Sequence, residues 1–196
     1  MKKLLITGFE PFGGQVINPS WESVLKLSDT IGNYQLYKMQ IPTVFNRASQ
    51  LVIQRVTELS ADAVICVGQA GGRKAVNLEV VAINLQETNS FDNEGNAPKN
   101  TPIVKDGPVA YFCTLPVRKM LENIVCEGVN CSLSYSAGTF VCNDVLYSLL
   151  HRFSDSDKQI GFIHLPFLPE QASEGVASMT LDEMVKALEI AIKTLT

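Results

Sequence analysis

Several features that would point to common protein classes are missing from this sequence of 196 residues. No apolar run approaches the roughly 20 residues of a membrane helix, and no Lys/Arg cluster is longer than Lys2-Lys3. The formal net charge is −4. Nucleic-acid-binding proteins usually present a basic face, so we expect no nucleic-acid partner. We also expect no membrane association.

The amino terminus lacks a secretion signal. Two lysines precede an apolar run, but that run covers only Leu4 to Ile6, whereas the apolar region of a signal peptide has about 7 to 15 residues. We therefore expect a cytoplasmic protein with reduced thiols. The five cysteines are odd in number and show no paired motif spacing, which indicates free thiols rather than a disulfide framework.

Nucleotide-binding motifs are also missing. The glycine-rich stretches "GFEPFGG" (8–14) and "GQAGGR" (68–73) lack the spacing of the dinucleotide fingerprint and of the Walker loop. Each follows a predicted strand, and each has backbone N–H groups that could hold a carbonyl or an anion. Neither is a specific signal for a nucleotide.

The chain does have the composition and the patterning of an α/β domain. Hydrophobic residues make up 46% and charged residues 18%, and the length suits a single domain over residues 1–196. Apolar, β-branched runs predict strands at Lys3–Thr7, Tyr34–Ile41, Ala63–Val67, Leu78–Leu85, Val129–Tyr135 and Gln159–Leu165. Helical periodicity predicts helices at Trp21–Leu27, Val44–Leu59, Pro116–Glu127, Asn143–Phe153 and Thr180–Leu195.

This alternation predicts a three-layer α/β/α sandwich around a twisted, largely parallel sheet. Tyr34–Ile41 alternates polar and apolar residues, so we place it toward an edge. The polar segment 86–109 is longer than most unstructured connections. Such a loop is usually a lid, a contact arm or a mobile segment.

Only two histidines are available for chemistry. His151 lies near the end of a predicted helix, where the helix dipole explains a basic residue. His164 lies at the carboxyl end of an apolar strand, just before Pro166. Active sites of open α/β sheets lie at that edge, so His164 is the candidate base, although a buried structural histidine is the simpler alternative.

Cys142 is the best candidate for a nucleophile among the five cysteines. The other four, Cys66, Cys113, Cys126 and Cys131, lie in apolar stretches or beside a turn and are read as packing or incidental thiols. Cys142 alone begins a predicted helix, where the exposed N–H groups and the dipole favour the thiolate.

Glu79 is the candidate for the group that orients the histidine. It interrupts the apolar strand "NLEVVAINL", and a carboxylate there must be either paired or exposed at an edge, since burying it alone is costly. A Cys-His-Glu arrangement indicates nucleophilic catalysis. Two alternatives stay open at this point: a non-catalytic α/β protein that binds an anion, and a cysteine hydrolase acting on some other acyl group.

Five blocks of this sequence resemble the pyrrolidone-carboxylate peptidases, also called the pyroglutamyl peptidase I family. The blocks are "LITGFEPFGG" with "NPS", "VGQAGGR" with "E-V-VAIN", "DNEGN-P", "AGTFVCN" and "GFIHLPFLPEQ". They follow the order of the family and span nearly the whole chain. The resemblance implies a cysteine exopeptidase that removes an N-terminal pyroglutamyl (5-oxoproline) residue from peptides through an acyl-enzyme.

The resemblance also implies roles for individual residues. The catalytic Cys, His and Glu of the family fall on Cys142, His164 and Glu79. Its contacts with the pyroglutamyl ring fall on Phe9, Phe12, Asn18, Gln69, Phe140 and Val141. It implies no metal and no other cofactor, and it implies a homo-oligomer, either a dimer or a tetramer.

Three positions depart from the family pattern. Val80 replaces an arginine in E-R-V-A-I-N, and the arginine of the following D-A-R-I-P pattern is replaced by Asn89, so two positive charges are missing near the expected cleft. Asp144 replaces a frequent histidine directly after the Cys-Asn pair. We expect its charge to raise the pKa of Cys142, against the effect of the helix dipole.

Overall fold

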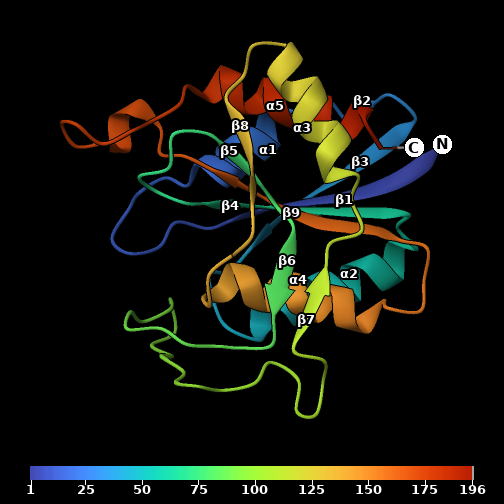
Figure 1. Ribbon diagram of the computed structural model, residues 1–196, viewed down its shortest axis with the longest axis vertical. Coiled ribbons are helices and arrows are strands. Elements are labelled where there is room, and N and C mark those ends of the chain that lie inside the picture. Colours follow the sequence, from blue (N-terminus) through green and yellow to red (C-terminus); the bar gives the residue numbers. More distant parts are fainter. Residues whose placement is uncertain (196) are drawn as a thin grey trace.

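The computed structural model describes residues 1–195 and is built around a seven-stranded sheet (Figure 1). The strand order is β2-β3-β1-β4-β9-β5-β8. The strands are β1 (Lys2–Phe9), β2 (Thr30–Ile31), β3 (Tyr34–Ile41), β4 (Ala63–Gln69), β5 (Val76–Glu79), β8 (Cys131–Ser134) and β9 (Gln159–Leu165). Four of the neighbouring pairs are parallel, whereas β2–β3 and β5–β9 are antiparallel. The prediction of a largely parallel α/β sheet is confirmed.

Helices cover both faces of this sheet (Figure 1). One face carries α1 (Pro19–Lys26), α3 (Val117–Cys126) and α5 (Leu181–Lys193), and the other carries α2 (Arg47–Leu59) and α4 (Val141–Arg152). The buried apolar side chains accordingly form two clusters, one on each side. The three predicted layers are present, and each helix begins and ends within a few residues of its expected bounds.

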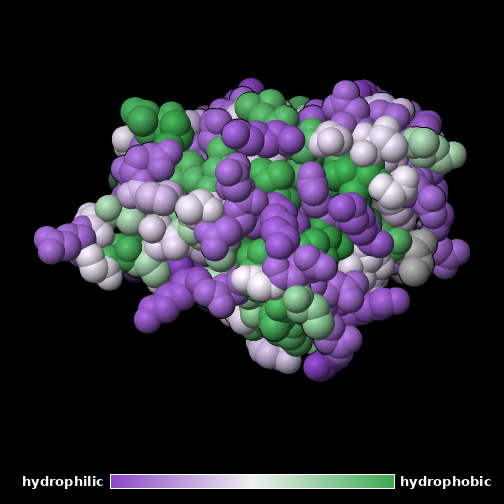
Figure 2. All heavy atoms as spheres, turned by 90° about the horizontal axis from the view of Figure 1, so that it is seen from above, coloured by the Kyte–Doolittle hydropathy of each residue, from purple (hydrophilic) through white to green (hydrophobic). Residues whose placement is uncertain are grey.

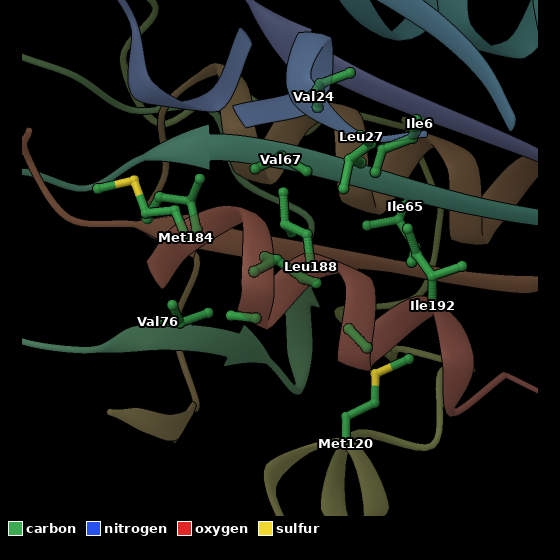
Figure 3. Close-up of a cluster of buried hydrophobic side chains, with 14 of the residues drawn as sticks. Ile6, Val24, Leu27, Ile65, Val67, Val76, Met120, Met184, Leu188 and Ile192 are labelled. Carbon is green, nitrogen blue, oxygen red and sulfur yellow. The ribbon is translucent and has the colours of Figure 1, made fainter. Parts of the chain in front are cut away.

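The first cluster shows how the periodic sequence of α5 produces this packing. Met184, Leu188 and Ile192 recur on one helical face and lie against Ile65 and Val67 of β4 (Figure 3). All five side chains are fully or almost fully buried. Shortening a buried leucine or methionine to alanine costs about 2–5 kcal/mol, so a few such contacts fix the helix on the sheet.

The predicted strand Leu78–Leu85 is wrong as a single element. It divides at Val80 into β5 and β6 (Val81–Ile83), and β6 pairs with β7 (Ala110–Phe112) in a separate two-stranded sheet. Every residue of β5 is buried, whereas β6 is buried only at its central residue. The continuous apolar pattern therefore hides a change from a central strand to a half-exposed one.

Strand β3 and segment 86–109 both lie at the periphery of the sheet's core. The alternating strand β3 has only the two-residue β2 outside it, which confirms its place toward an edge. Segment 86–109 is held against the body: Asp92 accepts a hydrogen bond from Phe45 N (3.0 Å), and Asn93 Nδ2 donates to Glu10 Oε1 (2.8 Å) and to the Pro11 carbonyl (3.0 Å). It braces the loop that follows β1.

The surface seen from above mixes hydrophilic and apolar side chains (Figure 2). Within residues 1–195, no helix has the length and apolar character that a membrane span needs. In the same part of the chain, no three His, Cys, Asp or Glu side chains gather in a way that would hold a metal ion.

Candidate active site

Cys142 is the second residue of α4, where the helix meets the sheet. Its Sγ lies directly on the backbone of β4, because a Cβ atom added to Gly68 would be only 3.1 Å from it and 2.8 Å from the Phe162 ring. Only glycine leaves this space free. His164 of β9 is the register partner of Gly68, about 4.8 Å away across the strand pair, so the thiol and the imidazole occupy neighbouring places above the sheet.

The imidazole of His164 is held from behind by Glu79. His164 Nδ1 and Glu79 Oε1 are 2.7 Å apart, and the two side chains are 4% and 0% exposed. An ionised carboxylate accepts only, so Nδ1 carries the proton and Nε2 is left as the basic nitrogen. Glu79 therefore lies in the paired position, and not at the solvated edge that the sequence also allowed.

Strand direction brings these two residues together in an unexpected way. β5 runs antiparallel to β9, with Asn77 opposite His164, within a sheet that the sequence predicted to be largely parallel. Glu79 is the last residue of β5 and His164 is the penultimate residue of β9. The carboxylate reaches the histidine across this antiparallel pair, one of two in a largely parallel sheet.

A cavity of about 400 Å³ opens beside Cys142 and His164. Its lining combines three aromatic rings, polar groups and backbone: Phe9, Phe12, Asn18, Gln69, Ala70, Arg73, Ser136, Ala137, Gly138, Phe140, Cys142 and His164. Seven of the nine expected site residues line it. The exceptions are Glu79, which lies behind His164, and Val141, whose fully buried side chain belongs to the core beneath α4.

Aromatic packing fixes the walls of this cavity. The rings of Phe12 and Phe140 lie 6.2 Å apart, and Phe45 meets Phe140 edge-on at 5.2 Å. Phe162 lies 4.7 Å from the imidazole of His164. Edge-on and tilted ring pairs stabilise such an arrangement beyond the area that they bury.

Asn18 has a structural task within the lining. Its side chain accepts hydrogen bonds from Ser20 N (3.1 Å) and Ser20 Oγ (2.7 Å), and its amide donates to the Glu10 carbonyl (3.1 Å). It caps α1 and closes the loop that carries Phe12.

Gln171 is a supporting residue that the sequence did not single out. Its Nε2 donates to Gln69 Oε1 (3.0 Å) and to the Ile17 carbonyl (3.3 Å), while its Oε1 accepts from Leu168 N (3.1 Å). One amide thus joins the segment after β9 to the end of β4 and to the loop after β1. The "PEQ" end of the last motif was the available signal.

Comparisons with known proteins identify the family of this chain. The model of the family described as pyroglutamyl peptidase matches residues 2–196. The chain belongs to the pyroglutamyl peptidase family. A pyrrolidone-carboxylate peptidase of Bacillus mycoides is 46% identical over 201 residues, which cover 100% of this chain and 94% of the relative.

Solved structures of this family share the fold. Pyroglutamyl peptidase I of Bacillus amyloliquefaciens superposes with a TM-score of 0.95 at 44% identity, covering 100% of this chain and 97% of the other. Pyrrolidone carboxyl peptidase of Thermococcus litoralis gives a TM-score of 0.95 at 35% identity, covering 100% and 93%. The family resemblance and the fold class predicted from the sequence are confirmed.

In this member of the pyroglutamyl peptidase family, the pKa of Cys142 is raised and not lowered. Burial, followed by the charge of Glu79, raises the pKa of the Cys142 thiol to about 12, while Arg73 and the backbone N–H of Cys142 act in the opposite direction. The helix terminus acts in the expected direction, through the backbone N–H of Cys142, but burial and the charge of Glu79 outweigh it. At neutral pH the resting group is a thiol, whose proton has to pass to a base during attack.

Asp144 does not act on Cys142 in the way that its position suggested. Its charge is not among the causes of the raised pKa of Cys142. Its carboxylate points to the start of α2, where it accepts from Asn46 N (2.9 Å) and Ser49 Oγ (3.2 Å), and to Gln86 Nε2 (2.8 Å). Asp144 therefore joins α4, α2 and segment 86–109.

We expect Asp144→Ala to lower the free energy of unfolding by about 1–3 kcal/mol, because buried donors would lose their acceptor. Burial raises the pKa of Asp144. Because the folded state binds this proton more tightly than the unfolded state, Asp144 stabilises the fold increasingly as pH falls from above the raised pKa toward 3.8. The stability lost in Asp144→Ala should therefore be larger near pH 5 than at pH 7. Urea unfolding of both proteins at the two pH values measures this. A changed pH profile of kcat/KM without a loss of stability would contradict the assignment.

The positions that lack the family's positive charges lie away from the cavity. Val80 occupies the break between β5 and β6, and Asn89 is exposed in segment 86–109, where its Oδ1 accepts from Lys99 Nζ. Neither residue lines the cavity, whereas Arg73 does. Arg73 was not among the residues predicted for the site, although a cation in the loop just before a strand that carries an acid is a usable signal.

The remaining cysteines and the second histidine have other surroundings. His151 lies in the last turn of α4, and its Nδ1 is 2.9 Å from Tyr111 Oη, which supports a structural role. All five cysteines are free; Cys66 is buried and Cys126 is exposed. His151 and the four cysteines other than Cys142 do not line the cavity, although Cys66 packs in the same core cluster as Cys142.

Proposed function

We propose that this protein is a cysteine peptidase that removes an N-terminal pyroglutamyl residue from peptides. The observation that carries the proposal is the Glu79–His164 hydrogen bond beside Cys142 at the start of α4, within an aromatic-walled cavity. A thiol, a base with a fixed tautomer and an acid that orients it are the parts that acyl transfer needs.

In the proposed reaction, His164 Nε2 takes the proton of Cys142 as Sγ attacks the pyroglutamyl carbonyl. The thiol carries its proton at neutral pH, so removal of that proton accompanies the attack. The tetrahedral intermediate collapses as the imidazolium gives the proton to the leaving amine, which frees the shortened peptide and leaves a thioester. His164 then deprotonates a water molecule that hydrolyses the thioester, and pyroglutamate is released.

The start of α4 is suited to the oxyanion of the intermediate. The first backbone bond at this terminus is from Asp144 N to the Phe140 carbonyl (3.2 Å), so the N–H groups before Asp144 have no partner within the helix. These groups lie beside Sγ and carry the positive end of the helix dipole. They would stabilise the developing negative charge.

The cavity also suits a neutral lactam ring. Phe12 and Phe140 present apolar faces, and the strand end at Gln69 and the 136–138 segment supply backbone polar groups. Placing a charged N-terminal amine between these apolar walls would cost its hydration without supplying an opposite charge, whereas a pyroglutamyl ring is neutral. We propose that Phe9, Phe12, Asn18, Gln69, Phe140 and Val141 form or support the ring pocket.

We expect Phe12→Ala to raise KM for a pyroglutamyl amide about tenfold, with a smaller change in kcat. The ring contact of Phe12 with Phe140 and with the substrate contributes about 0.5–1.5 kcal/mol, and 1.4 kcal/mol is tenfold in affinity. Steady-state kinetics provide the measurement, with Phe91→Ala, an exposed phenylalanine outside the cavity, as the matched control. An unchanged KM would remove Phe12 from the pocket.

A direct assay tests the proposed specificity. The protein should release the fluorophore from a pyroglutamyl amide and leave the matching prolyl amide, which lacks the lactam carbonyl and bears a charged amine, essentially intact. Equal turnover of the two amides, or none of either, would refute the proposed specificity.

We further propose that the protein works in the cytoplasm as a homo-oligomer. The five free cysteines suit a reducing compartment. Large apolar side chains are exposed on and around the short strand β7, notably Val109 (86%) and Phe112 (74%), and such side chains are common in interfaces. Light scattering after gel filtration, on wild type and on Phe112→Asp, measures the mass. A wild-type monomer would contradict self-association.

A further inference from the structure

Arg73 is placed at the centre of the site without being one of the reacting groups. It follows β4 in the "GQAGGR" loop, and its side chain is 33% exposed. Among the cavity-lining residues, all within the described part of the chain, it is the one lysine or arginine. Its Nη1 is 3.0 Å from Glu79 Oε1.

The contact falls on the same carboxylate oxygen that binds His164. Glu79 Oε1 receives His164 Nδ1 at 2.7 Å and Arg73 Nη1 at 3.0 Å, whereas Oε2 has no hydrogen-bond partner within residues 1–195. With His164 as its only partner, the carboxylate would be free to turn about its terminal torsion. Arg73 supplies the second point that fixes its plane.

Arg73 in turn is tied to the wall of the cavity. Its Nη1 lies 3.4 Å from Ser134 Oγ, and its Nη2 lies 3.4 Å from the Ser136 carbonyl. Ser136 Oγ accepts from Gly138 N (3.2 Å). One guanidinium therefore joins the acid behind the histidine to the segment that lines the substrate cavity.

The positive charge of Arg73 also supports the catalytic groups, in addition to its hydrogen bonds. A fully buried carboxylate is costly unless a cation compensates it, and Arg73 is the cation in contact with Glu79. The charge of Glu79 raises the pKa of Cys142, and that of Arg73 lowers it. Without Arg73, the thiol would be still harder to deprotonate.

We propose that Arg73 is a positioning residue for the peptidase reaction: it clamps the Glu79 carboxylate in the plane that holds His164 Nδ1 and couples that clamp to the cavity wall at Ser136. The proposal rests on the proposed function. Arg73 lines the cavity but is not among the residues proposed to hold the ring, so its removal should lower turnover far more than substrate binding.

The test is a double-mutant cycle between Arg73→Met and Glu79→Gln. We expect Arg73→Met to lower kcat for a pyroglutamyl amide about 10- to 100-fold, the range found for outer partners that orient histidines at metal sites, with KM within about twofold. Arg73→Lys should recover part of kcat. In the Glu79→Gln background, Arg73→Met should cost less than about threefold, because the clamp has no carboxylate left to hold. Lys74→Met, the exposed neighbouring cation, should match the wild type.

A second measurement is independent of turnover. The proton shared by His164 Nδ1 and Glu79 should give a downfield imidazole NMR signal in the wild type, in Arg73→Lys and in Lys74→Met. In Arg73→Met this imidazole signal should be lost or broadened by exchange, while the backbone amide signals remain those of a folded protein.

The outcomes separate this inference from the proposed function. Additive losses in the cycle, a rise in KM as the main effect, or an unchanged imidazole signal in Arg73→Met would overturn the role of Arg73 even in an active enzyme. A wild type that cleaves no pyroglutamyl amide would refute the proposed function, and the NMR signal would then still decide whether Arg73 positions the Glu79–His164 pair.

Discussion

Cys142→Ser should lose turnover of a pyroglutamyl amide by a factor on the order of 10⁴ to 10⁶, the loss found when the nucleophile of a catalytic triad is removed. A serine hydroxyl is smaller than the thiol and fits the space above Gly68, but it is far harder to deprotonate. The loss should appear in kcat, with substrate affinity retained, because the ring pocket is untouched.

The other cysteines supply the control for this variant. Cys126→Ser changes an exposed thiol and should match the wild type in kcat, KM and stability. Cys66→Ser places a hydroxyl in a fully buried strand and should reduce stability more than activity per folded molecule. Retained activity in Cys142→Ser, with Cys126→Ser unchanged, would show that another group is the nucleophile.

Glu79→Gln should lower kcat about 10³- to 10⁴-fold, as does the equivalent change of acid to amide in a serine protease triad. The amide has nearly the shape of the carboxylate, but its NH₂ group can donate to His164 Nδ1. The imidazole would then carry its proton on Nε2, where it cannot accept the thiol proton. Arg73 Nη1 would at the same time lose its anionic acceptor.

Glu79→Asp is the matched control, since it keeps the charge and shortens the reach by one methylene. It should retain more activity than Glu79→Gln if the acceptor character of residue 79 is what matters. Kinetics should be measured on protein whose folding has been checked by circular dichroism. Activity in Glu79→Gln within about threefold of wild type would contradict the tautomer argument.

Periodicity was enough to predict the layers, because each helix and each central strand buries one side or both. The division of Leu78–Leu85 at Val80 was not predictable, since an apolar run does not show where the chain leaves one sheet for another. The antiparallel direction of β5 was hidden for a similar reason: direction depends on tertiary packing, and no local pattern records it.

Within the site, the positions of Cys142 and His164 followed from where a helix begins and where a strand ends. The protonation of Cys142 did not follow, because the effect of burial in three dimensions exceeds that of the helix terminus. Asp144 was close to Cys142 in sequence, yet its side chain leaves α4 toward α2. Gln171 contacts Ile17 and Gln69, which are distant in the chain, so local sequence does not reveal its contacts. Arg73 contacts Glu79, only six residues away, but that contact depends on the path of the loop between them.

The central claim is that Cys142 carries the pyroglutamyl group during the reaction. It is tested most directly by acid-quenching the protein during turnover of a pyroglutamyl ester and mapping the acylated residue by peptide mass spectrometry. We predict one pyroglutamyl group on the peptide containing Cys142, and none in Cys142→Ser. Acylation of a different residue, or turnover with no acylated protein when acylation is the faster step, would contradict the account.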